Sequence, residues 1–262
     1  MSRLPTLYLP HGGGPCFFMD FGPGDPWGPL ARWLAAFPSA LPAVPRAILV
    51  ISAHWEAPVP TLLTAPNPPL LFDYYGFPPH TYQLTWPAPG ASFLVPRVRQ
   101  LLDAAGIPSA EDPTRGYDHG VFVPLKVSFP NAEIPTLQLS LRQGLDPAAH
   151  QALGRALAPL RDEGVLILGS GLSFHNMQMF QTAQAMPVSE RFDAWLAETV
   201  TADVPERTER LNAWASVGRL AHPREEHLLP LMVVAGAAGH DRGTIPFRGP
   251  MMGALVSAVQ FG

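Results

Sequence analysis

Arg46-Ala-Ile-Leu-Val-Ile-Ser52 is the stretch that decides the fold, because residues 47–51 within it form an unbroken apolar run of strand length. Two further segments are also expected to be buried strands: Thr136-Leu-Gln-Leu-Ser140 and Val165-Leu-Ile-Leu-Gly169. The first and third are apolar at successive positions rather than at alternate ones. Such strands are expected where helices cover both faces of a sheet. These segments therefore predict a buried central sheet.

Helical patterns lie before, between and after these strands, and they predict a layered α/β architecture. The expected helices are residues 28–36, 92–105, 147–161, 189–201 and 206–215, and residues 228–239 are apolar throughout, as in a buried helix. Ser189 is the expected N-cap of its helix. Strands alternating with helices favour a central mixed or largely parallel sheet flanked by helices. Without an internal repeat or a polar linker, we expect residues 1–262 to form a single domain.

Composition narrows the possible partners and the compartment. Charged residues make up only 15% of the chain, against about 25% in an average soluble domain, which favours an apolar pocket or a homo-oligomer interface. The formal charge of −4 comes without a Lys/Arg cluster, so neither nucleic acid nor a membrane is an expected partner. The N-terminus has no signal-peptide pattern, and the lone Cys16 forms no intramolecular disulfide. We therefore expect a cytoplasmic protein in which Cys16 packs in the core.

Prolines dominate residues 58–89, so this stretch is expected to be a long ordered loop or a lid. It is rich in aromatic side chains, which either pack onto the core or line a pocket for a flat substrate. Tyr74 and Tyr75 are the candidates that we name for substrate binding.

Four histidines stand in marked contexts: Leu9-Pro-His11-Gly-Gly-Gly-Pro15, Ile51-Ser-Ala-His54-Trp55, Leu172-Ser-Phe-His175-Asn176 and Arg224-Glu-Glu-His227-Leu-Leu-Pro230. His11 follows an extended segment at residues 6–10, His54 follows residues 48–52, and His175 lies shortly after residues 165–169. Ligands in open α/β sheets bind beyond the carboxyl ends of the strands. Neutral imidazole is also the commonest metal ligand. The set therefore predicts a metal site.

The neighbours of these histidines support that interpretation. Gly12, Gly13 and Gly14 permit a tight turn, and they lack the ending of a phosphate loop. Glu226, beside His227, is a further ligand, an orienting partner or a solvated charge at a helix start. His119, in Gly116-Tyr-Asp-His-Gly120, is a fifth candidate that a turn aims inward. The other histidines have weaker contexts, and His150 is expected on the surface of a helix.

Together these motifs, in this order from residue 7 to about 232, resemble the class III extradiol ring-cleavage dioxygenases, and specifically the DOPA 4,5-dioxygenase-like branch of the aromatic ring-opening dioxygenase superfamily. The resemblance implies one non-haem divalent metal, Fe(II) for catalysis, although Zn(II) is also found in such sites. It implies His11, His54 and His227 as ligands, His175 as an acid/base residue or fourth ligand, and His119 as a contact for substrate or dioxygen. The wider superfamily has a glutamate as third ligand where this chain offers His227.

The implied reaction uses O2 and a small aromatic diol, a substituted catechol that includes DOPA-like compounds. An amino-acid substrate would need charged partners, for which the sequence offers Asp20, Asp73, Arg115 and Arg142. Two alternatives use the same histidines: a zinc-dependent hydrolase, and a ligand-binding member of the superfamily without turnover.

Overall fold

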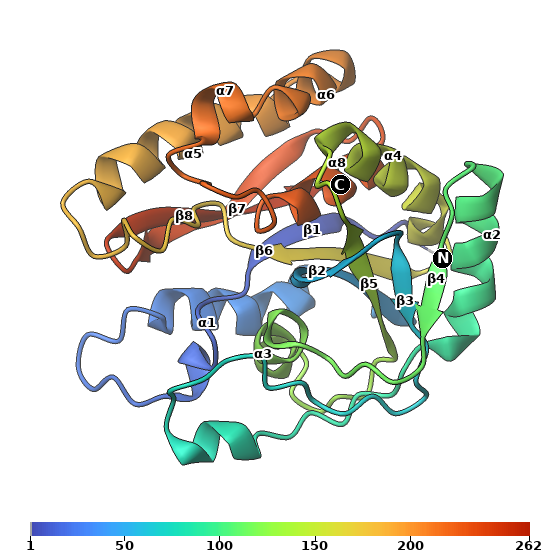
Figure 1. Cartoon of the computed structure of the whole chain (residues 1–262), viewed down its shortest axis with the longest axis horizontal. Helices are drawn as coiled ribbons and strands as arrows, with labels where there is room; N and C mark the ends of the chain where they lie inside the picture. The colour runs from blue at the N-terminus through green and yellow to red at the C-terminus, as the bar shows by residue number, and fades with distance from the viewer. Residues whose placement is uncertain (1) are drawn as a thin grey trace.

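An eight-stranded sheet forms the centre of the computed structural model, which describes residues 2–262 (Figure 1). The strand order is β4-β3-β5-β2-β6-β1-β8-β7. The bounds are β1 Thr6–Pro10, β2 Ala47–Ala57, β3 Thr61–Leu63, β4 Ala110–Asp112, β5 Thr136–Arg142, β6 Val165–Gly171, β7 Gly243–Met251 and β8 Ala254–Phe261. The central strands β5, β2, β6 and β1 are parallel, and β7 and β8 add an antiparallel hairpin beside β1.

The central strands are buried on both faces, as their unbroken apolar sequences predict. In β2, Ile48 and Val50 pack into one hydrophobic core, while Leu49 and Ile51 pack into the core on the opposite face. This division follows from the two-residue repeat of a strand. Two layers of helices are therefore required, one for each face.

Helices α1 (Gly28–Ala36) and α3 (His119–Ser128) contribute to the core on one face, and in Figure 1 they lie below the sheet. The core of the other face receives side chains from α2 (Val95–Ala104), α4 (Pro147–Leu157), α5 (Ala185–Thr201) and α8 (Leu229–Ala238). The short helices α6 (Val204–Asn212) and α7 (Ala215–Gly218) follow α5 along the chain. The layered α/β fold is thus confirmed.

Most expected helices are present, with changed ends. Residues 92–94 and 158–161 are 3-10 turns that adjoin α2 and α4. The expected cap at Ser189 is wrong, because α5 begins at Ala185 and the Ser189 hydroxyl donates to Met186 O inside the helix. His150 is also not on the surface: it is buried, and its Nε2 accepts a hydrogen bond from the Arg142 amide.

The hairpin of β7 and β8 has no counterpart among the expected elements. Pro246 and Pro250 lie in β7, and proline argues against a central strand. The sheet accommodates them because β7 is an edge strand. The hairpin turn also places Met251 and Met252 beside the histidines.

The proline-rich residues 58–89 form an ordered connection that includes β3 and a 3-10 turn at Pro79–Gln83. Tyr74 and Trp86 are buried in the core shared with α1 and α3, and Phe72, Phe77 and Tyr82 pack against it. Core packing therefore accounts for much of the aromatic content. Among the described residues, none of the helices combines the length and apolar character that crossing a membrane requires.

Candidate metal centre and its cavity

Neighbouring parallel strands deliver the histidines to one edge of the sheet. His11 directly follows β1, and its amide donates to Gly171 O at the end of β6 (3.1 Å). His175 lies four residues beyond β6, and His227 lies two residues before α8 rather than on its first turn. The carboxyl ends of β1, β2 and β6 thus meet as the strand rule predicts.

His54 lies within β2, and not after it, because the strand extends to Ala57. The register of β2 against β5 shifts between Ile51 and Glu56. Such an irregularity re-aims the side chains beside it, and it is common near functional sites. In this strand the register shift lies beside His54, whose imidazole points toward His11.

The imidazoles of His11, His54 and His227 converge. Their nearest ring nitrogens all lie within 4.8 Å of one another, and the Nε2 atoms of His11 and His54 are 3.3 Å apart. Gly12 and Gly14 have positive φ angles of 87° and 52°, which allow the chain to turn sharply after His11. The sequence therefore identified three residues that the fold brings to one point.

The surroundings of these three imidazoles favour their neutral form. Burial, followed by the neighbouring histidines, lowers the pKa of His11 and of His54 well below the usual value. Burial also lowers the pKa of His227, to about 4. His11 Nδ1 is buried without a hydrogen-bond partner. A cluster of uncharged nitrogens with free lone pairs is a donor set that fits a divalent transition metal.

Glu226 orients this cluster from the side. Its Oε1 accepts a hydrogen bond from His227 Nδ1 (2.9 Å) and lies 3.2 Å from His175 Nδ1. Burial alone would raise the pKa of Glu226, but hydrogen bonds from His175 and His227 outweigh burial and hold the pKa far below its usual value. Glu226 is only 9% exposed, which excludes the solvated charge at a helix start among the three expected roles.

His175 and His119 flank the three converging histidines. The His175 ring stacks on His227 with centroids 3.4 Å apart, and its amide donates to Ala221 O. His119 is the first residue of α3, and its ring centroid lies 3.9 Å from that of His54. A helix start, rather than an isolated turn, aims His119 inward.

Asp73 is the partner that fixes His119. Its Oδ1 accepts hydrogen bonds from the His119 amide (2.9 Å) and from His119 Nδ1 (2.8 Å). The sequence marked Asp73 only as a charge for an amino-acid substrate. The two residues are 46 positions apart, and no local pattern links them.

The five histidines line one cavity of about 310 Å³. The rest of its wall is glycine and the following apolar side chains: Trp27, Leu172, Met177, Phe180, Met251 and Met252. Tyr74 and Tyr75 lie outside this wall. The Tyr74 hydroxyl donates to Thr81 O (2.6 Å), and Tyr75 is 91% exposed.

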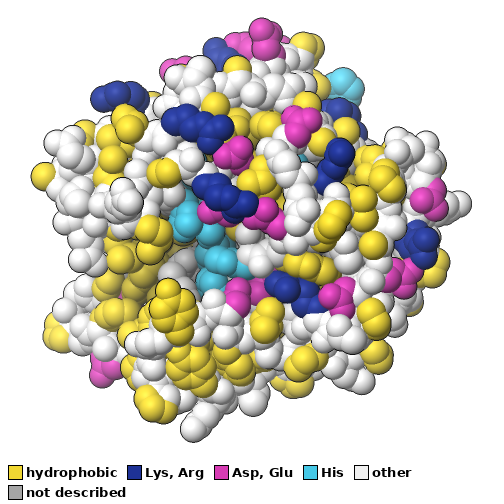
Figure 2. Space-filling model, in the orientation of Figure 1, with side chains coloured by type: hydrophobic (Ala, Val, Ile, Leu, Met, Phe, Trp, Pro, Cys, Tyr) yellow, Lys and Arg dark blue, Asp and Glu magenta, His cyan; other side chains and the backbone are white. Residues whose placement is uncertain are grey.

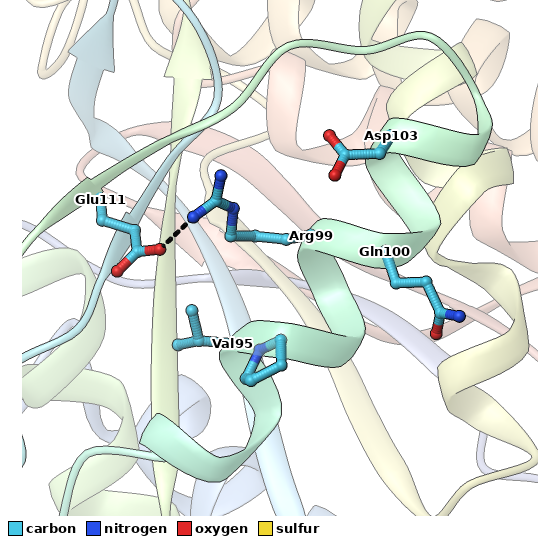
Figure 3. A pocket seen from close by; sticks show the side chains of 6 residues that line it. Val95, Arg99, Gln100, Asp103 and Glu111 are labelled. Atoms are coloured by element: carbon cyan, nitrogen blue, oxygen red, sulfur yellow. Dashed lines mark hydrogen bonds and ion pairs between the residues drawn. The ribbon is translucent and has the colours of Figure 1, made fainter.

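A separate hollow between α2 and β4 contains no histidine (Figure 3). Arg99 spans it and donates to Glu111 Oε1 (2.6 Å), so its charge is already paired.

A family model described as the catalytic LigB subunit of aromatic ring-opening dioxygenase matches residues 9–252. The chain belongs to this family. It is 42% identical over 200 residues to a 4,5-DOPA dioxygenase extradiol of Beta vulgaris, covering 75% of each chain. It is 34% identical to the protein of the same name from Escherichia coli, covering 100% of this chain and 96% of the relative.

Another relative, dioxygenase tasH of Hapsidospora irregularis, is 37% identical, with 92% of this chain and 80% of that protein covered. A crystal structure of an uncharacterized Escherichia coli K12 protein, JW3007, has the same fold with a TM-score of 0.80 at 31% identity. The match covers 99% of this chain and 100% of that one. The protein is an extradiol ring-cleaving dioxygenase, which argues against the hydrolase and the ligand-binding alternatives.

Proposed function

We propose that this dioxygenase opens the ring of a substituted catechol next to its two hydroxyl groups, with one divalent metal held by His11, His54 and His227. The observation that carries the proposal is the convergence of three imidazoles at a cavity, with one ring nitrogen of each within 4.8 Å of the others. Fe(II) is the catalytic metal in this proposal, and Zn(II) suits the same ligands. When bound, the metal would be chelated by the two oxygens of the diol and would supply the site at which dioxygen is activated.

His175 would carry the proton. Its Nδ1 lies beside the Glu226 carboxylate, which leaves Nε2 as the nitrogen available to the cavity. A base at this position would take a hydroxyl proton as the catechol binds and return a proton as the ring opens. Both atoms of O2 enter the product, which is a hydroxymuconic-semialdehyde type of compound with visible absorption.

His119 would contact the substrate or dioxygen on the opposite side. The Asp73 carboxylate holds its Nδ1 (2.8 Å) and so fixes the ring, with Nε2 left free. His175 thus lies against His227 and His119 lies against His54, and each has its Nδ1 beside a carboxylate: Asp73 for His119, and Glu226, which His227 shares, for His175.

The relatives named 4,5-DOPA dioxygenase make DOPA one of the catechols to test. The single cysteine and the low charge fraction support two further expectations, a cytoplasmic location and a homo-oligomeric assembly.

The test is an oxygen-electrode screen of catechols with protein that has been loaded anaerobically with Fe(II). We expect oxygen uptake together with a new visible chromophore, and neither with protein loaded with Zn(II). His54→Ala should lose the metal. The control His240→Ala replaces an exposed histidine outside the cavity and should retain it. If no catechol of a broad panel supports oxygen uptake, the proposal is wrong.

A further inference from the structure

We propose that the catechol carries a bulky apolar substituent, an aryl or branched alkyl group, rather than the charged amino-acid side chain of DOPA. The inference rests on the proposed function. It comes from a second, apolar cavity that continues the histidine cavity on one side.

Among residues 2–262, the wall of the histidine cavity offers no lysine, arginine or carboxylate side chain as a charged partner for a carboxylate or an ammonium. Apart from the five imidazoles, its wall is made of glycine and apolar side chains. Moving a charged group from water into such a wall is unfavourable unless a partner compensates for the lost hydration.

The charged residues that the sequence offered to an amino-acid substrate are engaged elsewhere. Asp20 accepts from the Gly22 amide, and Asp73 accepts from His119. Arg115 is paired with the buried Asp118 (3.1 Å) and lies over the Trp55 ring. Arg142 lines a different hollow beside His150.

An outer cavity of about 460 Å³ adjoins the histidine cavity, and the two share Gly13, Gly14, Trp27, Met177 and Met252. Its other side chains are almost all apolar as well. The larger apolar groups of its wall are Met19, Phe21, Trp27, Phe77, Met177 and Met252.

The polar side chains of the outer wall are the Gln181 amide and the buried Cys16 thiol. The histidine cavity alone reaches the size of a small-molecule site, about 300–1,000 Å³. The outer cavity therefore provides room for a second ring or a branched chain that is attached to the catechol.

The opposite side of the histidines is charged. In Figure 2 histidine side chains lie in a hollow that has hydrophobic side chains on its left and basic and acidic side chains on its right. On the charged side, Arg224 lines a groove with His175 and Glu226.

Arg224 is already neutralised. Its guanidinium lies 2.6 Å from Glu56 and 3.3 Å from Glu226. A substrate carboxylate placed there would face Glu56 and Glu226, so this groove offers no free cation to the carboxylate of an amino-acid substrate. The geometry therefore directs the substituent toward the outer cavity.

Binding to the metal-free protein tests the inference without turnover. The measurement is isothermal titration calorimetry with 4-phenylphenol and with L-tyrosine. Both compounds are phenols substituted opposite the hydroxyl group, and they differ only in that substituent. The expected result is at least 10-fold tighter binding of 4-phenylphenol. Equal or tighter binding of L-tyrosine would overturn the inference.

Turnover by the Fe(II)-loaded enzyme gives the second readout. The kcat/KM for 4-phenylcatechol should exceed that for L-DOPA at least 10-fold. If L-DOPA is the better substrate, the inference fails while the proposed function stands. If neither these compounds nor unsubstituted catechol is turned over, the proposed function itself fails.

Met19→Glu tests the outer cavity directly, because Met19 is a half-buried part of its wall that does not line the histidine cavity. This variant should lower kcat/KM for 4-phenylcatechol at least 10-fold more than for unsubstituted catechol. The matched control Val44→Glu adds the same charge at a residue that is 85% exposed and outside both cavities.

The ratio of the two kcat/KM values should stay at the wild-type value in Val44→Glu. A changed oligomeric state in Met19→Glu without a change in this ratio would overturn the inference, since the outer cavity would then be a contact between copies of the chain.

Discussion

Glu226→Gln provides the sharpest test of how the metal centre is held. The substitution keeps the size of the side chain and an oxygen that accepts from His227 Nδ1, but it removes the negative charge beside His227 and His175. A carboxylate that binds the far nitrogen of a ligand histidine fixes the ring and raises its basicity. The loss of such a partner weakens metal affinity about 10–100-fold.

That range corresponds to about 1.4–2.8 kcal/mol of binding free energy, at about 1.4 kcal/mol for each factor of ten. We expect Glu226→Gln near the lower end, because its oxygen still accepts the hydrogen bond. Glu226→Ala should lie near the upper end, because both the charge and the acceptor are lost.

The assay is a competition between the protein and a chromophoric chelator for Zn(II), followed at fixed pH. Glu225→Gln is the matched control: Glu225 is the preceding residue, but its carboxylate pairs with Arg219 (2.7 Å) instead of a histidine. Its Zn(II) affinity should equal that of the wild type. The reasoning is refuted if Glu226→Gln and Glu226→Ala both bind Zn(II) within about twofold of the wild type, or if Glu225→Gln loses as much affinity.

Three further predictions concern catalysis, pH and packing. His175→Ala should lower kcat about 10²–10⁴-fold while the metal content is retained, because a proton carrier is lost and not a ligand; metal analysis and oxygen uptake distinguish these outcomes. Burial lowers the pKa of His222 to about 3. Below about pH 6.5 this side chain is therefore protonated in the unfolded chain but stays neutral in the folded protein, so the stability of the fold decreases as the pH falls. Between pH 7.5 and 5 the free energy of unfolding should fall by about 2 kcal/mol because of this one group. In His222→Asn this part of the decrease should be absent when stability is measured by urea unfolding at both pH values. In Gly120→Ala the new methyl would lie 2.5 Å from Ser52 Oγ and 2.9 Å from His54 Cδ2. We therefore expect the free energy of unfolding to fall by about 1–3 kcal/mol. An unchanged urea midpoint would contradict this prediction.

The sequence by itself determined the central layer and most of the histidine site. Unbroken apolar runs such as residues 47–51 predict strands buried on both faces, because a strand covered on both sides favours apolar side chains at successive positions. Parallel strands end at a common edge, so His11 and His54 could be placed together from the residues around them alone.

Only the tertiary structure decided the partners of these histidines. Asp73 meets His119 across 46 residues, and no periodic pattern of the sequence records a contact between a loop residue and the first residue of a distant helix. The sequence left three possible roles for Glu226. Its burial beside His175 and His227 excluded one of them, the solvated charge at a helix start.

The tertiary structure alone also gave the cavity its chemical character. Met252 and Met177 come from the β7–β8 turn and from the segment after β6, and they meet Trp27 from the start of α1. Local hydrophobic patterns predict which residues are buried, but only long-range packing decides which of them face one another around a space. That is why the sequence predicted a ring-cleaving metal site, whereas the apolar space beside the site became visible only in the folded chain.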